Sequence, residues 1–185
     1  MARVAKLGDR AVLLQGQVPT DGQRLTAEFV IPAARVADTP LTAAALRCGL
    51  VVVSTLPNIQ KHACLEQIVD LEELGHTWLP GLRIVHVSAD HEEHWKEVDR
   101  FHPDIRSEGY SLCCADPASR EAFMLAFGVG VENHRRIAHG LFALLNGRVV
   151  AAEVPEDQMK PASVRVFVER VAALVGGSAE RQQAS

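Results

Sequence analysis

Cys64 has the position in this chain best suited to chemistry. It lies in PNIQKHACLEQIVDLEEL, residues 57–74, where a proline and a short polar stretch precede an apolar-periodic run that predicts a helix. A helix N-terminus carries partial positive charge and favours a thiolate, and Lys61 and His62 add two potential cations. The pattern therefore predicts a nucleophilic thiol with a lowered pKa. The competing interpretation is a small, buried core residue.

The other cysteines are Cys48, Cys113 and Cys114. No CxxC pair occurs, which excludes the usual dithiol redox motif and the usual half-sites of zinc fingers. We interpret the adjacent pair as core residues of a short strand, YSLCCAD, with one side chain on each face. We expect Cys48 at the far end of the first core strand from Cys64.

A metal site is not expected. His91 and His94 have helical i, i+3 spacing and could share a metal ion, but no third ligand of clear spacing accompanies them. We therefore interpret these two histidines as part of a solvated helix face, with no metal and no bound organic cofactor.

Cys64 belongs to a predicted helix that lies between two predicted strands in the sequence. GLVVVSTLP (49–57) is a β-branched run bounded by glycine and proline, and LRIVHVSAD (82–90) is a second apolar run. The helix between them is expected to stop at Gly75. Such a unit predicts parallel strands with a right-handed crossover. Cys64 then lies beyond the carboxyl end of a parallel strand, where α/β sheets place their sites.

The remaining elements complete a mixed α/β pattern. We predict an N-terminal hairpin around Gly8-Asp9, a helix over 91–101 capped by Ser88 or Asp90, a helix over 117–127, a hairpin at Asn146-Gly147 and a last helix over 162–176. A parallel pair followed by an antiparallel hairpin and a packed helix predicts a thioredoxin-like α/β fold. We expect one domain over residues 1–176 and a disordered polar tail over 177–185.

Composition excludes several classes of partner. The net charge is −4 and no basic block occurs, which argues against a nucleic-acid or membrane partner. No apolar run approaches the ~20 residues that span a bilayer. Asp9 and Arg10 interrupt the N-terminal apolar stretch, so it is a poor signal peptide. We expect a cytoplasmic protein with free thiols.

The whole chain resembles the thiol peroxidases of the atypical two-cysteine peroxiredoxin class. Their motif is a proline, three residues, Thr or Ser, two residues and a cysteine, and Pro57 and Cys64 keep that spacing. Residues 87–101, 120–129 and 141–150 resemble further segments of the family. The resemblance implies a mixed central sheet flanked by helices, a homodimer, and Cys64 as the peroxidatic cysteine, whose thiolate reduces hydrogen peroxide or small alkyl hydroperoxides and becomes a sulfenic acid. Pro57 would shield that thiolate.

Three positions depart from the family pattern. Lys61 stands where the family has a Thr or Ser hydroxyl, and His139 stands where it has a pocket arginine, with Arg135 and Arg136 nearby. His102 stands where the resolving cysteine would follow an Arg-Phe pair. We expect Lys61 and His139 to support Cys64, and a histidine there makes any activity sensitive to pH.

The resolving step therefore has several candidates. They are an external thiol, from a thioredoxin-like protein or a small molecule, and the internal cysteines at 48, 113 and 114. A different interpretation of the same departures is a peroxiredoxin-like domain that has lost catalytic power and serves as a binding or redox-sensing module. A protein-thiol reductase is disfavoured by the missing CxxC.

Overall fold

The run of β-branched residues at 51–53 lies at the centre of a six-stranded sheet in this computed structural model, which describes the backbone of residues 3–183 and side chains up to residue 176. The sheet order is β11-β10-β6-β7-β8-β4. Its strands are β4 (Ala33–Arg35), β6 (Leu50–Leu56), β7 (Arg83–Ser88), β8 (Glu108–Ser111), β10 (Gly140–Leu145) and β11 (Arg148–Glu153). Strands β6, β7 and β8 are parallel, and the other pairings are antiparallel.

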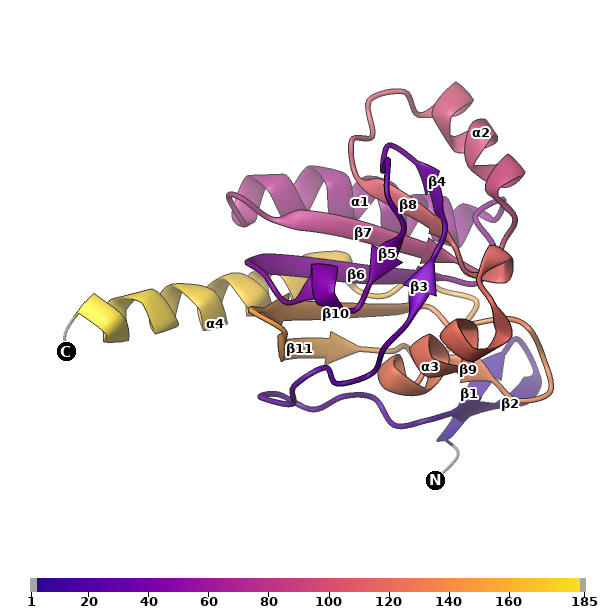
Figure 1. Cartoon of the computed structure of the whole chain (residues 1–185), viewed down its shortest axis with the longest axis horizontal. Helices are drawn as coiled ribbons and strands as arrows, with labels where there is room; N and C mark the ends of the chain where they lie inside the picture. Colours follow the sequence, from indigo (N-terminus) through magenta and orange to yellow (C-terminus); the bar gives the residue numbers. More distant parts are fainter. Residues whose placement is uncertain (1–2, 184–185) are drawn as a thin grey trace.

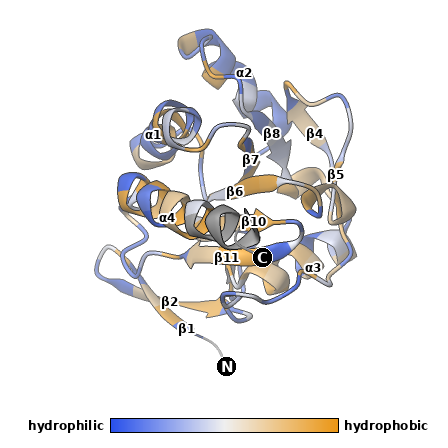
Figure 2. Ribbon diagram, turned by 90° about the vertical axis from the view of Figure 1, so that its left-hand side faces the viewer, coloured by the Kyte–Doolittle hydropathy of each residue, from blue (hydrophilic) through white to orange (hydrophobic). Residues whose placement is uncertain are grey.

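Helices cover both faces of this sheet. Figure 2 shows α1 (His62–Trp78) and α4 (Val164–Gln183) on one side and α3 (Pro117–Phe127) on the other, with α2 (Glu92–Phe101) beside β4 and β8. Alternate residues of β6 face opposite layers, as a strand requires. Val51 and Val53 pack in the cluster that contains Phe123, whereas Val52 packs in the cluster that contains Phe167.

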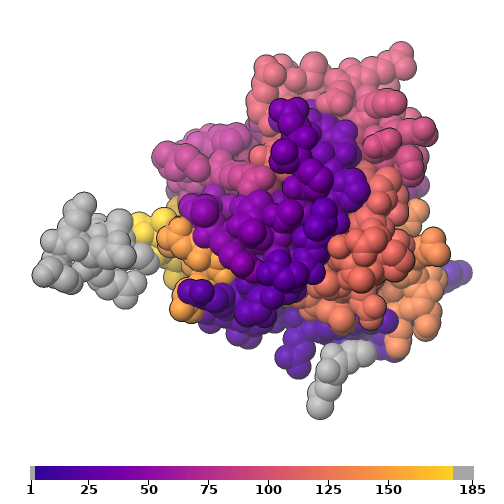
Figure 3. Space-filling model, in the orientation of Figure 1, coloured from indigo at the N-terminus to yellow at the C-terminus, as the bar shows by residue number. Residues whose placement is uncertain are grey.

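Smaller elements surround the central sheet. β1 (Arg3–Leu7) and β2 (Arg10–Gln15) form the predicted N-terminal hairpin, which β9 (Gly130–Val131) extends (Figure 1). β3 (Val30–Ile31) pairs with β5 (Leu41–Thr42), and the 3₁₀ turn η1 (Ala44–Leu46) follows. The indigo and purple residues between β2 and β6 cover much of the face in Figure 3.

Several local predictions are confirmed. β6, α1 and β7 form the predicted parallel unit. Asn146 and Gly147 both have positive φ, 51° and 75°, as a type I′ hairpin turn requires. The helix predicted over 117–127 is present as α3; Asp116 at its N-terminus accepts hydrogen bonds from two backbone N–H groups, and Gly128 ends it in the left-handed region.

Gly75 does not end α1, contrary to the prediction. The helix continues to Trp78, and Gly75 lies inside it. A Cβ at this position would lie 3.0 Å from Leu82 Cδ2 and 3.2 Å from Ile84 Cδ1. This glycine therefore lets the helix approach β7 closely, so its role is packing rather than termination.

Three other boundaries also differ from expectation. β8 ends at Ser111, and the two adjacent cysteines lie in the 3₁₀ turn η2 (Leu112–Cys114) rather than in a strand. The N-cap of α2 is His91, which makes no side-chain capping bond. The two predicted caps, Ser88 and Asp90, are hydrogen-bonded to each other instead. α4 runs to Gln183, since residues 177–183 include good helix formers. The end of the predicted polar tail, 184–185, lies outside the described residues.

Within residues 3–183, no helix combines the length and apolarity needed to cross a membrane.

Candidate active site

Cys64 lies in the first turn of α1, directly after the loop that follows β6. Lys61 is the N-cap of this helix, in an extended conformation, and its carbonyl accepts a hydrogen bond from the Cys64 N–H at 3.0 Å. The Asn58 N–H donates to the Cys64 Sγ at 3.4 Å. Only 1% of Cys64 is exposed. The predicted position of Cys64 at a helix N-terminus is confirmed, and its thiol is buried.

The pKa of Cys64 moves in the direction opposite to the prediction. Burial raises the pKa of this thiol to about 12. The hydrogen bond from the Asn58 N–H lowers this pKa, Asp90 raises it further, and Arg136 lowers it. Loss of water around a buried thiolate costs more than the nearby positive charge returns. At neutral pH the resting group is therefore a thiol.

His139 lies against this thiol, although it is 75 residues away in the chain. Its Nε2 is 3.7 Å from the Cys64 Sγ, and its Nδ1 is 3.1 Å from the Gln67 Oε1. The His139 backbone N–H donates to the Gln158 Oε1 at 2.6 Å. Burial lowers the pKa of His139 to about 4, so the imidazole is neutral near pH 7.

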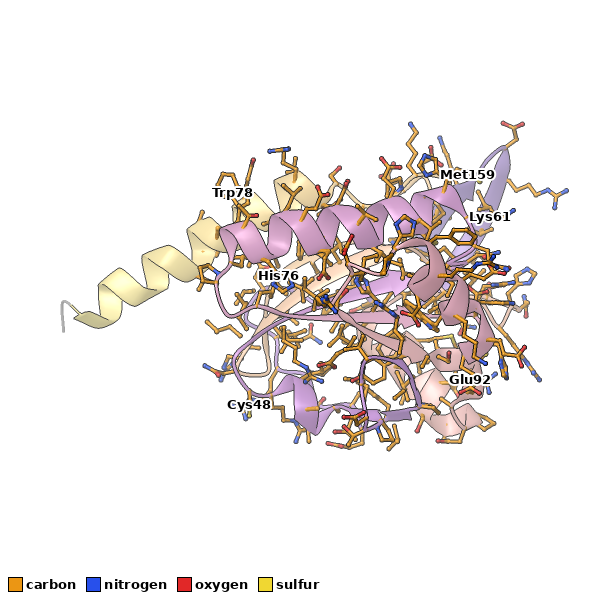
Figure 4. The ribbon with its side chains drawn as sticks, turned by 90° about the horizontal axis from the view of Figure 1, so that it is seen from above. Cys48, Lys61, His76, Trp78, Glu92 and Met159 are labelled. Carbon is orange, nitrogen blue, oxygen red and sulfur yellow. The ribbon has the colours of Figure 1, made fainter. Side chains whose placement is uncertain are left out.

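Lys61 and Pro57 line the same pocket as Cys64. The Lys61 side chain is exposed, and Figure 4 shows it at the same end of the molecule as Met159. Both residues line a pocket of about 570 Å³ that also reaches Cys64, His139 and Pro57. The pocket wall includes apolar residues of the N-terminal hairpin, Leu7 and Val12. The structure thus brings all four predicted site residues to one pocket.

Arg136 lines this pocket and pairs with the buried carboxylate of Asp90. The Asp90 side chain, 3% exposed, accepts hydrogen bonds from the Ile59 N–H at 2.7 Å and the Ser88 hydroxyl at 2.9 Å. Arg136 donates to Asp90 Oδ1 and to the Pro57 carbonyl, both at 2.8 Å. This pair ties the loop before α1 to the end of β7 and to the segment before β10. Sequence reasoning mentioned Arg136 only as a neighbour and missed this role of Asp90.

Gln67 is the second residue that sequence reasoning missed. It is fully buried, one turn after Cys64 on α1. Its position on the inner face of the helix, among apolar residues, was the available signal, because a buried glutamine needs partners for both ends of its amide. Those partners come from β6, from β10 and from the segment before α4.

The other three cysteines lie in two separate parts of the fold. Cys48 is exposed at the opposite end of the molecule from Lys61, as Figure 4 shows and as we expected. Cys113 and Cys114 are half-buried in η2, and their Sγ atoms are 3.7 Å apart. Burial raises the pKa of Cys113 to about 11, with further contributions from Cys114 and Asp90. Cys113 and Cys64 are thus both close enough to Asp90 to respond to its charge.

Among the described residues, no group of three or more His, Cys, Asp or Glu side chains is arranged to hold a metal ion.

Comparison with known proteins gives matches in structure alone. The sequence matches no protein-family model and no curated protein. A peroxiredoxin-like protein from Aquifex aeolicus is 19% identical, with a TM-score of 0.76 over 94% of this chain and 98% of its own. A thiol peroxidase from Chromobacterium violaceum is 12% identical, with a TM-score of 0.78 over 96% and 98%. The peroxidoxin BcpB from Mycobacterium tuberculosis is 16% identical, with a TM-score of 0.64 over 86% and 97%.

These similarities cover 86–96% of this chain and 97–98% of each of the three proteins. At such low identity they establish the architecture. The predicted resemblance is thereby confirmed for the fold: this chain has the thioredoxin-like α/β fold of the peroxiredoxins and thiol peroxidases.

Proposed function

We propose that this protein is a thiol-dependent peroxidase that reduces hydrogen peroxide or small alkyl hydroperoxides, with Cys64 as the peroxidatic cysteine. The observation that carries the proposal is the group around its Sγ: the Asn58 N–H at 3.4 Å and the His139 ring at 3.7 Å, inside a pocket. Cleavage of an O–O bond by a thiol needs a sulfur nucleophile together with polar groups that stabilise the negative charge on the departing oxygen. The peroxiredoxin fold of the structural neighbours supports this reaction class.

The pocket favours organic hydroperoxides alongside hydrogen peroxide. Its volume of about 570 Å³ is much greater than hydrogen peroxide requires. Pro57 lines the pocket together with Cys64, and Leu7 and Val12 add apolar surface for an alkyl group. The exposed ammonium of Lys61 contributes positive charge at the mouth without a direct contact to the thiol.

The sulfenic acid at Cys64 requires a second thiol for its reduction. Cys48 is excluded as the resolving thiol within one chain. It precedes β6 and Cys64 follows it, and the seven residues of this strand span about 20 Å. A disulfide needs Cα atoms within about 7 Å of each other. We therefore propose an external thiol reductant, with Cys113 or Cys114 as the internal alternative. We also propose that the protein is a cytoplasmic homodimer.

One observation favours the alternative of a weakened, redox-sensing domain. Cys64 is 1% exposed, and burial raises its pKa to about 12, so the resting protein holds almost no thiolate. In that case Cys64 would be oxidised slowly, and the modified protein would serve as the signal.

Single-turnover oxidation separates these functions. The reduced protein is mixed with one equivalent of hydrogen peroxide or of a small alkyl hydroperoxide, and a sulfenic-acid trap is read by peptide mass. If the protein is a peroxidase, we expect rapid modification confined to Cys64. This modification should be absent in Cys64→Ser and unchanged in the matched control Cys48→Ser. Oxidation at Cys64 no faster than at exposed Cys48 would overturn the peroxidase and favour the sensing domain.

A further inference from the structure

The amide of Gln67 has its orientation determined by five neighbours. Its Nε2 lies 2.9 Å from the Ser54 hydroxyl, 3.3 Å from the Thr55 carbonyl and 3.4 Å from the Gly140 carbonyl. Carbonyls only accept hydrogen bonds, so this end must be the NH₂ group. The Oε1 accepts from the Ala162 N–H at 3.0 Å. A flipped amide would oppose donor to donor and acceptor to acceptor at once, so one orientation is specified.

This orientation determines which nitrogen of His139 carries the proton. The His139 Nδ1 lies 3.1 Å from the Gln67 Oε1, which has no hydrogen to offer, so Nδ1 must be the donor. A neutral imidazole has one N–H, and Nε2 is therefore unprotonated. That bare Nε2 lies 3.7 Å from the Cys64 Sγ. His139 thus presents a proton acceptor to the thiol, where a guanidinium would present only donors.

We propose that His139 Nε2 accepts the proton of the Cys64 thiol during catalysis and that Gln67 is the positioning residue that holds His139 in the required tautomer. This inference rests on the proposed peroxidase function. As the proton moves to Nε2, the Cys64 Sγ bonds to the terminal oxygen of the peroxide and the O–O bond breaks. The departing alkoxide or hydroxide takes the proton back from Nε2. The products are a sulfenic acid, an alcohol or water, and a neutral His139.

The buried environment of Cys64 explains why the thiol would need His139 as a base. A thiol whose pKa burial raises to about 12 has almost no anion at neutral pH, so a base in contact with it supplies the nucleophile when it is needed. The other charged or titratable groups that line the pocket are Lys61 and His62 on the α1 side and His134 and Arg136 on the segment before β10. Asp90, after β7, lies behind this wall and pairs with Arg136.

Nitrogen NMR tests the tautomer without any peroxide. The full-length reduced protein is labelled with ¹⁵N-histidine, and His139 is assigned by comparison with His139→Gln. At pH 7 we expect Nδ1 protonated and Nε2 unprotonated. In Gln67→Met the acceptor is removed and the two tautomers should mix, whereas the exposed control Gln60→Met should keep the wild-type pattern. A protonated Nε2 in the wild type would overturn the proposal.

Alkylation kinetics test the proton transfer in the same protein. Iodoacetamide modification of Cys64 is followed by peptide mass from pH 5 to 7, with exposed Cys48 as an internal reference thiol. Transfer within a neutral pair leaves the net proton count unchanged, so the wild-type rate at Cys64 should be flat, whereas Cys48 should rise about tenfold per pH unit. In His139→Gln the Cys64 rate should fall about 10²–10⁴-fold at pH 7 and gain the slope of Cys48.

The outcomes separate the two proposals. A Cys64 profile that is the same in the wild type and in His139→Gln would overturn the role of His139, whatever the peroxide kinetics. A flat wild-type profile with a protonated Nδ1 and no rapid reaction with peroxide would support the acid–base pair and overturn the peroxidase. If Gln67→Met does not fold, the wild-type spectrum and the His139→Gln profile still decide.

Discussion

Two buried histidines make the stability of this protein fall in mildly acidic solution. Burial lowers the pKa of His86, which is fully buried, from 6.5 to about 3, and lowers the pKa of His139 from 6.5 to about 4. Arg35 contributes to the shift at His86. Between pH 6.5 and the folded-state values, the unfolded chain binds protons that the folded chain does not. Stability from these two groups is therefore present above pH 6.5 and is lost as the pH falls.

The magnitude follows from proton linkage. Each histidine contributes a slope of up to about 1.4 kcal/mol per pH unit. Integrated from pH 6.5 to pH 5, the two together lower the free energy of unfolding by about 3 kcal/mol. This is a large part of the roughly 5–15 kcal/mol typical of a folded domain. Paired carboxylates such as Glu108, whose pKa is lowered, contribute to acid unfolding mainly at lower pH.

Urea unfolding followed by far-UV circular dichroism measures this loss at a series of pH values from 7 to 5. His86→Gln should remove about half of the decrease, and the exposed control His91→Gln should keep the wild-type slope. The His139→Gln variant should remove the other half and so connects stability to the base proposed for Cys64. An unfolding free energy unchanged between pH 6.5 and pH 5 would show that the buried rings bind protons as readily as they do in the unfolded chain, and would refute the reasoning.

Three further substitutions test the frame of the site. Asp90→Asn weakens a charged hydrogen bond with Arg136 at 2.8 Å and should lower the free energy of unfolding by about 1–3 kcal/mol, as urea titration would show. Gly109→Ala places a Cβ 2.5 Å from Arg35 Cγ and should cost about 1–3 kcal/mol in the same titration; wild-type stability would contradict this close approach. Lys61→Met removes an exposed charge and should reduce the oxidation rate a few-fold, an effect that ~1 M salt abolishes because it screens charges beyond about 3 Å.

The local elements were predictable because their signals lie within a few residues of one another. The apolar run of β6, the Asn146-Gly147 turn and the helix over 117–127 each depend on neighbouring residues, and each is present. The parallel unit around Cys64 followed from strand, helix and strand in order. Gly75 was misjudged because its reason is the packing of β7 against α1, which no local pattern contains.

Some features of the candidate site were likewise predictable from the sequence, and others depend on the folded structure. The sequence by itself determined that a cysteine begins a helix after a core strand, and the resemblance directed attention to Pro57, Lys61 and His139. The direction of the Cys64 pKa depends on burial, and burial belongs to the folded chain.

Only the tertiary structure decided which groups serve the thiol. It brought His139 to within 3.7 Å of Cys64 and oriented its ring through Gln67, which hydrogen bonds to β6 and β10 hold in place. It likewise joined Asp90 to Arg136 across separate segments. A spacing along the chain predicts which residues start a helix, but hydrogen bonds between distant segments form only when the sheet and helices bring them together.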